Sequence, residues 1–313
     1  MSLFTSNSKN YQSSFKSNGI YILRPIIVAI VVLAVYQILI WCNFLTPHEG
    51  IAQQESNLIR AERYFYGDEA KTKFVVVGSS MIANIPVNDI GSNLFNLGIR
   101  GDSSVTGLEL VKLRKTKPSL VLVELNGTIS RKMNADLIKS FSYPVSYLSR
   151  LYFSMFRAEY RPISIFVTKL KKIKGDDNET VNVQQKTIQS ELEKNIVKRA
   201  VQTNSKLLNQ EEIDSLIKGA NFIQNQISEI RKGSIKVVLF DVPREQEVIE
   251  SPREKQIQQL IRNLFPKNNY EWLPDSLKTD WVTGDGVHLK SSDAVKYAEF
   301  LQETLQKKGY LSN

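Results

Sequence analysis

The chain has 313 residues, of which 42% are hydrophobic and 23% are charged. This length allows one domain of about 200–250 residues with a full hydrophobic core, together with attached segments. The formal net charge is +9, and Lys9, Lys16 and Arg24 supply +3 of it before the first acidic residue. The remaining +6 is spread over the rest of the chain. That modest balance fits a surface near anionic lipid or glycan and is far from a nucleic-acid-binding profile.

Cysteine and histidine are scarce. The one cysteine, Cys42, lies in a hydrophobic N-terminal segment, so the rest of the chain offers no intrachain disulfide and no thiolate metal site. The two histidines are His48, which directly follows that segment, and His288. Any histidine-dependent chemistry in the main domain must therefore use His288. We expect neither a cofactor nor a bound metal.

Residues 25–45 form an uncharged run of 21 residues, rich in Ile, Val and Leu. About 20 apolar residues in a helix cross a bilayer of about 30 Å, so this run predicts a transmembrane anchor. The basic residues before it indicate that residues 1–24 are a cytoplasmic tail, with the remaining chain outside the cytoplasm. A cleavable signal peptide is the alternative. Its apolar region is normally shorter, and residues 41–44 offer no small-residue cleavage site.

Beyond a linker and a polar helix in residues 46–72, short apolar runs alternate with helical patterns. The apolar runs are typical of strands that are covered on both faces. The alternation therefore predicts an α/β domain over residues 73–313, with a parallel sheet and helices on both faces. The predicted strands are residues 74–77, 93–99, 119–125 and 235–240, and the predicted helices are residues 104–115, 211–232, 252–264 and 292–308.

Between about residue 130 and residue 209 the alternation stops. This insert is first aromatic, then basic and finally polar. One interpretation is core packing or a lid over the active site. The other is a surface that lies on the membrane or against an integral-membrane partner, which Arg150, Arg157, Arg161 and the lysines of residues 169–174 support.

Residue types that can carry chemistry follow three predicted strands and precede the last helix. An open α/β sheet binds its ligands beyond the carboxyl ends of its strands, which makes these segments the candidate site. They are Gly-Ser-Ser at residues 78–80, Gly-Ile-Arg-Gly-Asp-Ser at residues 98–103, Asn-Gly-Thr at residues 126–128 and Asp-Gly-Val-His at residues 285–288.

The Ser80 hydroxyl is a candidate nucleophile, because a neighbouring neutral imidazole can take its proton near neutral pH. His288 is the candidate base. Asp285 lies three residues earlier and can orient the ring if the backbone turns at Gly286. Taken singly, each residue has an ordinary explanation. Serine after a strand often caps a helix, a lone histidine is usually structural, and Asp beside Gly favours a turn.

In this order, the four segments resemble the sequence blocks of the SGNH (GDSL-like) serine hydrolases. The resemblance implies a three-layer α/β/α, flavodoxin-like domain with Ser80, Asp285 and His288 as the catalytic residues. It also implies an oxyanion hole made by the backbone N–H groups of Ser80 and Gly101 and the side-chain amide of Asn126.

The chain departs from the family pattern at two positions. Ser79 stands where the commonest first block has Asp. The third block ordinarily reads Gly-x-Asn-Asp, whereas residues 125–128 read Leu-Asn-Gly-Thr. By register, Thr128 takes the place of the family asparagine and Asn126 comes two residues early, so either side chain is a candidate for completing the oxyanion hole.

A single anchor, an outward domain and a Gly-Ser-Ser first block resemble bacterial proteins that O-acylate envelope polymers, such as those of teichoic acid D-alanylation and alginate acetylation. The resemblance implies a serine esterase or O-acyltransferase that acts on an envelope or secreted polysaccharide through a seryl-acyl intermediate. A multi-spanning membrane-bound O-acyltransferase is the implied partner. The alternatives are a lipid or lysophospholipid esterase and a non-catalytic scaffold subunit of a polysaccharide synthesis or export complex.

Overall fold

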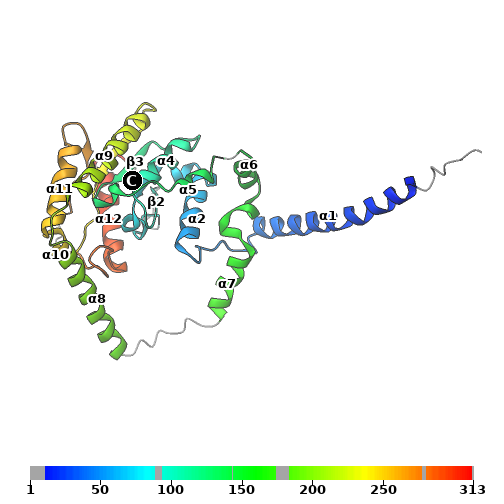
Figure 1. Cartoon of the computed structure of the whole chain (residues 1–313), viewed down its shortest axis with the longest axis horizontal. Coiled ribbons are helices and arrows are strands. Elements are labelled where there is room, and N and C mark those ends of the chain that lie inside the picture. The colour runs from blue at the N-terminus through cyan, green and yellow to red at the C-terminus, as the bar shows by residue number, and fades with distance from the viewer. Residues whose placement is uncertain (1–10, 89–93, 143, 174–182, 277–279, 312–313) are drawn as a thin grey trace, which may run out of the picture.

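A five-stranded parallel sheet lies at the centre of the computed structural model (Figure 1). The model describes residues 11–88, 94–142, 144–173, 183–276 and 280–311. The strands pair in the order β2-β1-β3-β4-β5. The chain turns back across the sheet between β1 and β3, and ligands bind at such a switch point. The strands are β1 (Phe74–Gly78), β2 (Leu94–Gly98), β3 (Leu120–Glu124), β4 (Lys236–Phe240) and β5 (Glu271–Trp272).

The central strands are apolar throughout because both of their faces are covered. In β1, Val75 and Val77 belong to one hydrophobic cluster, and Val76 between them belongs to another. Helices α4 (Ser104–Leu113), α9 (Gln210–Arg231) and α11 (Pro252–Leu264) contribute to the first cluster. Helices α3 (Ser80–Ala83) and α12 (Ser291–Lys307) contribute to the second. The predicted α/β class with a parallel sheet is confirmed.

The four predicted strands occur at the predicted places, although Asn93, the first residue of the second, lies outside the described residues. β5 was not predicted, because two residues are too few to show a period. The predicted polar helix corresponds to α2 (Gln53–Tyr66), which a short turn η1 (Ala70–Thr72) joins to β1. The sequence also did not predict α10 (Gln246–Ile249), a single turn after β4.

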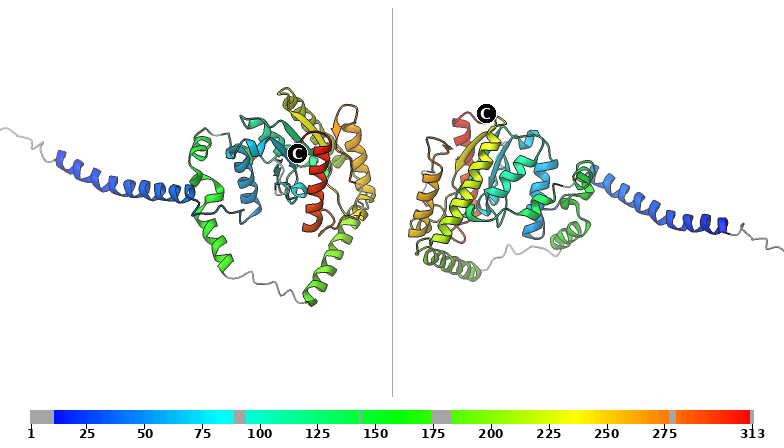
Figure 2. Two further views of the ribbon diagram at one scale, coloured as in Figure 1. Left: turned by 180° about the vertical axis from the view of Figure 1, so that it is seen from behind. Right: turned by 45° about the horizontal axis from the view of Figure 1, so that its top comes forward.

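The N-terminal helix α1 (Tyr11–Trp41) extends away from the rest of the chain (Figures 1 and 2). Its segment Leu23–Trp41 is long and apolar enough to cross a membrane. The helix ends four residues before the predicted end of the anchor at residue 45. Asn43 has a φ of 58°, a left-handed conformation that terminates helices.

The insert at residues 130–209 contains no strand in its described part. Its first half contacts α1 and α2 through short turns, whereas its last helix contacts α10, so the two halves lie against different parts of the domain (Figure 2). Lys174 lies outside the described residues. The elements that follow β3 are η2 (Gly127–Ser130), α5 (Ala135–Lys139), α6 (Pro144–Tyr152), η3 (Ser154–Phe156), η4 (Ala158–Tyr160), α7 (Pro162–Ile173) and α8 (Val183–Thr203).

Close packing of α9 on η2 requires a glycine. A Cβ at Gly219 would lie 1.9 Å from the backbone oxygen of Ile129. We expect Gly219→Ala to lower the free energy of unfolding by about 1–3 kcal/mol through overpacking. This would reverse the gain of about 1 kcal/mol that alanine normally brings to a helix interior. Urea unfolding of the full chain measures the change, with Gly233→Ala as a control whose Cβ would meet only ordinary contacts. A stabilised Gly219→Ala variant would contradict this packing.

Candidate functional site

Ser80 begins α3 directly after β1, and its hydroxyl is free to face the site. The cap of this helix is Ser79, whose side chain accepts a hydrogen bond from the Met81 N–H at 3.2 Å. Ser80 is therefore not the capping residue. Its Oγ instead lies 2.8 Å from Nε2 of His288, which is 208 positions away in the chain.

His288 is oriented by Asp285. The Nδ1 atom of the ring lies 2.6 Å from Oδ2 of Asp285. The other carboxylate oxygen accepts from the backbone N–H groups of Val287 at 3.0 Å and His288 at 2.8 Å. Burial alone would raise the pKa of Asp285, but these hydrogen bonds outweigh it and lower the pKa to about 2. An ionised Asp285 holds the proton on Nδ1, which leaves Nε2 as the acceptor for the serine hydroxyl.

The loop that carries Asp285 and His288 is fixed by hydrogen bonds that lead to Glu245, and α8 packs against it. Gly286 has a φ of 89°, which lets the chain turn between the two residues. Its N–H donates to the Thr283 hydroxyl at 2.9 Å, and that hydroxyl donates to Glu245 at 2.7 Å. A Cβ at Gly286 would lie 3.4 Å from Cβ of Ala200 in α8, so the last helix of the insert lies against this loop.

A buried glutamate forms hydrogen bonds with Ser79, the residue before the candidate nucleophile. Glu124, the last residue of β3, accepts from the Ser79 N–H at 2.5 Å and from the Ser79 hydroxyl at 3.0 Å. A Cβ at Gly78 would lie 2.1 Å from its Oε2 atom, so this carboxylate needs a glycine at that position. Glu124 was not among the residues predicted to form the site. The signal was an acidic residue at the end of the apolar run of residues 120–123.

The Asn126 side chain is buried, and most of its hydrogen-bonding groups have partners. It is 2% exposed, and its amide NH₂ donates to Glu124 Oε1 at 2.6 Å. Its oxygen accepts from the backbone N–H of Thr128 at 2.9 Å and from the Thr128 hydroxyl at 2.6 Å. The hydrogen bonds that Asn126 makes in the structure therefore go to Glu124 and Thr128. An amide NH₂ has two hydrogens, and Glu124 uses one of them.

Gly101 lies in the loop after β2, the strand that pairs with β1 in register from Gly78 to Gly98. It has a φ of 78° and is exposed. Its N–H has no acceptor among the described residues. The N–H of Ser80 is in the first turn of α3, where helical N–H groups lack an intrahelical acceptor. Both groups are thus available as donors to a bound ligand.

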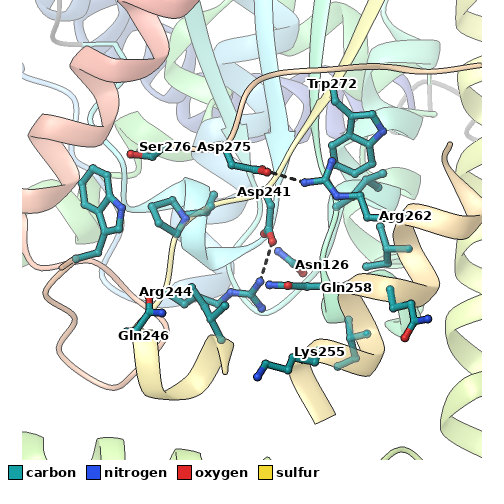
Figure 3. Close-up of a pocket in the computed structure, with 18 residues that line it drawn as sticks. Asn126, Asp241, Arg244, Gln246, Lys255, Gln258, Arg262, Trp272, Asp275 and Ser276 are labelled. Atoms are coloured by element: carbon teal, nitrogen blue, oxygen red, sulfur yellow. Dashed lines mark hydrogen bonds and ion pairs between the residues drawn. The ribbon is translucent and has the colours of Figure 1, made fainter. Parts of the chain in front are cut away.

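A cavity of about 510 Å³ opens at the carboxyl ends of β3, β4 and β5 (Figure 3). Asn126 and Asp241, which follow β3 and β4, both line it. Two arginines lie beside it and are held by carboxylates. Arg244 donates to Asp241 at 2.8 Å, and Arg262 donates to Asp275 at 2.9 Å. Because β1 and β3 are neighbours, the cavity is one strand away from the end of β1, at the same edge of the sheet.

The other histidine is structural. His48 is 3% exposed, its Nε2 lies 2.9 Å from the Ala158 carbonyl oxygen, and its Nδ1 accepts from the Gly50 N–H at 2.9 Å. Within the described ranges, no group of three or more His, Cys, Asp or Glu side chains is placed to hold a metal ion.

Comparisons with known proteins assign no family to this arrangement. No protein-family model matches the chain, and no curated protein matches it.

Glu124 should make stability depend on pH. Burial, together with the Asp241 carboxylate, raises the pKa of Glu124 to about 7 against the opposing hydrogen bonds from Ser79. An unfolded glutamate titrates near about 4.3, so between these values the folded state binds more protons. This contribution to stability is greatest at low pH and decreases as the pH rises to about 7. Glu124→Gln should remove that slope.

The measurement is urea unfolding of both proteins between about pH 5 and pH 8, in the range where this glutamate titrates. Glu247→Gln, at an exposed position in α10, is the matched control. Parallel pH curves for wild type and Glu124→Gln would show that Glu124 does not titrate in this range.

Proposed function

We propose that the chain is a serine-dependent acyl-ester enzyme of the SGNH type, either an esterase or an O-acyltransferase. One observation carries the proposal. Ser80 Oγ, the His288 ring and the Asp285 carboxylate form a continuous hydrogen-bonded chain, with links of 2.8 Å and 2.6 Å. They do so at the carboxyl edge of a parallel sheet, where α/β proteins bind ligands. Clusters on both sheet faces agree with the three-layer arrangement of that family.

The first half of the reaction forms a seryl ester. Ser80 Oγ attacks the carbonyl carbon of the acyl donor while its proton passes to His288 Nε2, and Asp285 stabilises the imidazolium. The negative charge on the carbonyl oxygen is met by the N–H groups of Ser80 and Gly101 and by the second hydrogen of the Asn126 amide. The bond to the leaving oxygen then breaks, and that oxygen takes the proton from His288.

The second half removes the acyl group from Ser80. Water or a sugar hydroxyl gives its proton to His288 Nε2 and attacks the carbonyl carbon of the seryl ester. The bond between that carbon and Ser80 Oγ then breaks, and Oγ takes the proton from His288, which restores the Ser80 hydroxyl. Water makes the chain an esterase, and a sugar hydroxyl makes it a transferase. The cavity beside the site supports a hydroxyl-rich acceptor, because carboxylates, guanidinium groups and amides supply both donors and acceptors around it.

The setting we propose is the outer side of a cell membrane. The part of segment Leu23–Trp41 from residue 25 onward serves as the anchor, and residues 1–24 lie in the cytoplasm. The domain lies outside, where envelope or secreted polysaccharides are the acceptors or substrates. In the transfer reaction, a multi-spanning membrane-bound O-acyltransferase would deliver the acyl group.

Removing the triad should abolish turnover. Ser80→Ala should lower kcat for p-nitrophenyl acetate by about 10⁴–10⁶, and Asp285→Asn should lower it by about 10⁴ because the histidine then loses its correct tautomer. A fluorophosphonate probe should label wild type and not Ser80→Ala. Equal activity of wild type and Ser80→Ala, with Ser80 unlabelled, would favour a non-catalytic scaffold. Added glycan acceptors separate transfer from hydrolysis, since only transfer yields an acylated glycan.

The third oxyanion donor is tested by Asn126→Ala. Loss of one such donor typically lowers kcat by about 10²–10³, with a smaller effect on KM. Thr128→Val is the matched comparison, because the Thr128 hydroxyl donates to Asn126 and needs no direct contact with the substrate. A larger loss in Thr128→Val than in Asn126→Ala would assign the role to Thr128.

A further inference from the structure

Large apolar side chains are exposed on the part of the insert that lies beside α1. We call α6, η3 and α7, with the turns between them, the juxtamembrane surface. Val145 is 79% exposed, Ile163 is 77% exposed and Phe166 is 63% exposed. A contiguous apolar surface of this kind marks an interaction site. Its other exposed apolar residues are Leu148, Leu151, Tyr152, Phe153, Phe156 and Leu170.

Both helices of this surface are amphipathic. In α7, Ile163, Phe166 and Leu170 follow the spacing i, i+3, i+7, which places them on one face. The opposite side holds the helix to the domain, since Ile165 is buried and the Ser164 hydroxyl donates to Glu55 at 2.8 Å. The exposed apolar face is therefore not needed to attach α7 to the domain.

The same spacing occurs in α6, where Val145, Leu148 and Tyr152 are exposed. Tyr147 points elsewhere and packs against Tyr66 of α2, with ring centroids 5.6 Å apart. Arg161 and Lys169 are exposed between and beside the apolar faces. Apolar faces flanked by basic side chains are typical of helices that lie in the membrane interface.

The contacts of α1 with η3 and η4 set how deep this surface would lie in a bilayer that α1 crosses. Tyr36 of α1 donates to the Tyr160 carbonyl at 2.6 Å, and the Met155 N–H donates to Gln37 at 3.1 Å. Phe153 and Phe156 line an apolar cavity of about 440 Å³, whose other wall is formed by residues of α1 between 30 and 41. A helix rises about 1.5 Å per residue, so that wall covers about 17 Å of the candidate span. The two phenylalanines thus lie beside residues that would be inside the apolar layer.

We propose that the juxtamembrane surface enters the outer leaflet of the lipid bilayer, with the rings of η3 among the acyl chains and α6 and α7 along the interface. The occupant is lipid rather than a soluble protein, because the surface is continuous with the exposed apolar side of α1. The inference rests on the membrane anchor of the proposed function and is independent of catalysis.

The test is a fluorescent label at single cysteines in the full chain, purified alone and reconstituted into phosphatidylcholine–phosphatidylglycerol vesicles. Cys42, the one native cysteine, is first changed to serine. Phe156→Cys and Phe166→Cys report on the juxtamembrane surface. Phe222→Cys is the matched control, since Phe222 is 41% exposed on α9, which lies on the far side of the domain from α1 (Figures 1 and 2).

Lipids with nitroxides in their acyl chains should quench the labels at 156 and 166 several-fold more than the label at 222. Aqueous iodide should show the opposite order, and emission at 156 and 166 should shift to shorter wavelength. Iodide quenching at all three positions would overturn the proposal. The proposal would also be overturned if neither agent quenched the labels at 156 and 166, because a second copy of the chain would then cover them.

A label at Val31→Cys, an exposed position within the candidate span, separates failure of the anchor from failure of this inference. If lipid nitroxides do not quench it, the chain is not anchored and both proposals about the membrane are wrong. If they quench it but not the labels at 156 and 166, only the juxtamembrane surface is wrong. Fluorophosphonate labelling of Ser80 in the same samples tests catalysis separately.

Discussion

A buried carboxylate joins the ends of two neighbouring strands, and the position of the candidate nucleophile depends on it. Glu124 closes β3 and binds both the backbone N–H and the hydroxyl of Ser79 at the end of β1. Ser79 can then cap α3, which directs the next residue, Ser80, toward His288. The same carboxylate holds the Asn126 amide. Position 79 is serine, where the SGNH hydrolases that these segments resemble commonly have aspartate, and in this chain the neighbouring strand supplies a carboxylate to it.

Much of the sheet could be predicted because its strands are apolar on both faces, and such runs are visible without any knowledge of their partners. The meeting of Ser80 with residues 285–288 could be expected from the family resemblance, since the segments are more than 200 positions apart. Asn126 shows the limit of that reasoning. Its side-chain amide suits an oxyanion hole, but in the structure it caps η2 through Thr128 and binds the buried Glu124, and both partners are two residues away in the chain. Whether the amide binds these local partners or a ligand depends on the burial of Glu124, which no sequence period reports.

The insert also shows why composition alone left two interpretations open. Its aromatic residues have mixed roles. Phe141 is buried and stacks on Phe65 with ring centroids 4.3 Å apart, as core packing requires. Val145 and Phe166 are exposed beside α1. Amino-acid type does not distinguish these roles, because both a core and a membrane surface select large apolar side chains. Only the position of each helix relative to α2 and α1 separates them.

The hydrogen bonds that Tyr36 and Gln37 form with the insert have a mechanical consequence. They attach α1 to the domain directly, in addition to the chain that connects α1 to α2. With α1 across the bilayer as proposed, these contacts would set both the height of Ser80 above the bilayer and the direction in which its site opens. Under the proposed activity, Ser80 would then act only on ester groups that are presented within a narrow layer. Polymers would have to be brought to that layer, because the domain cannot swing out to reach them.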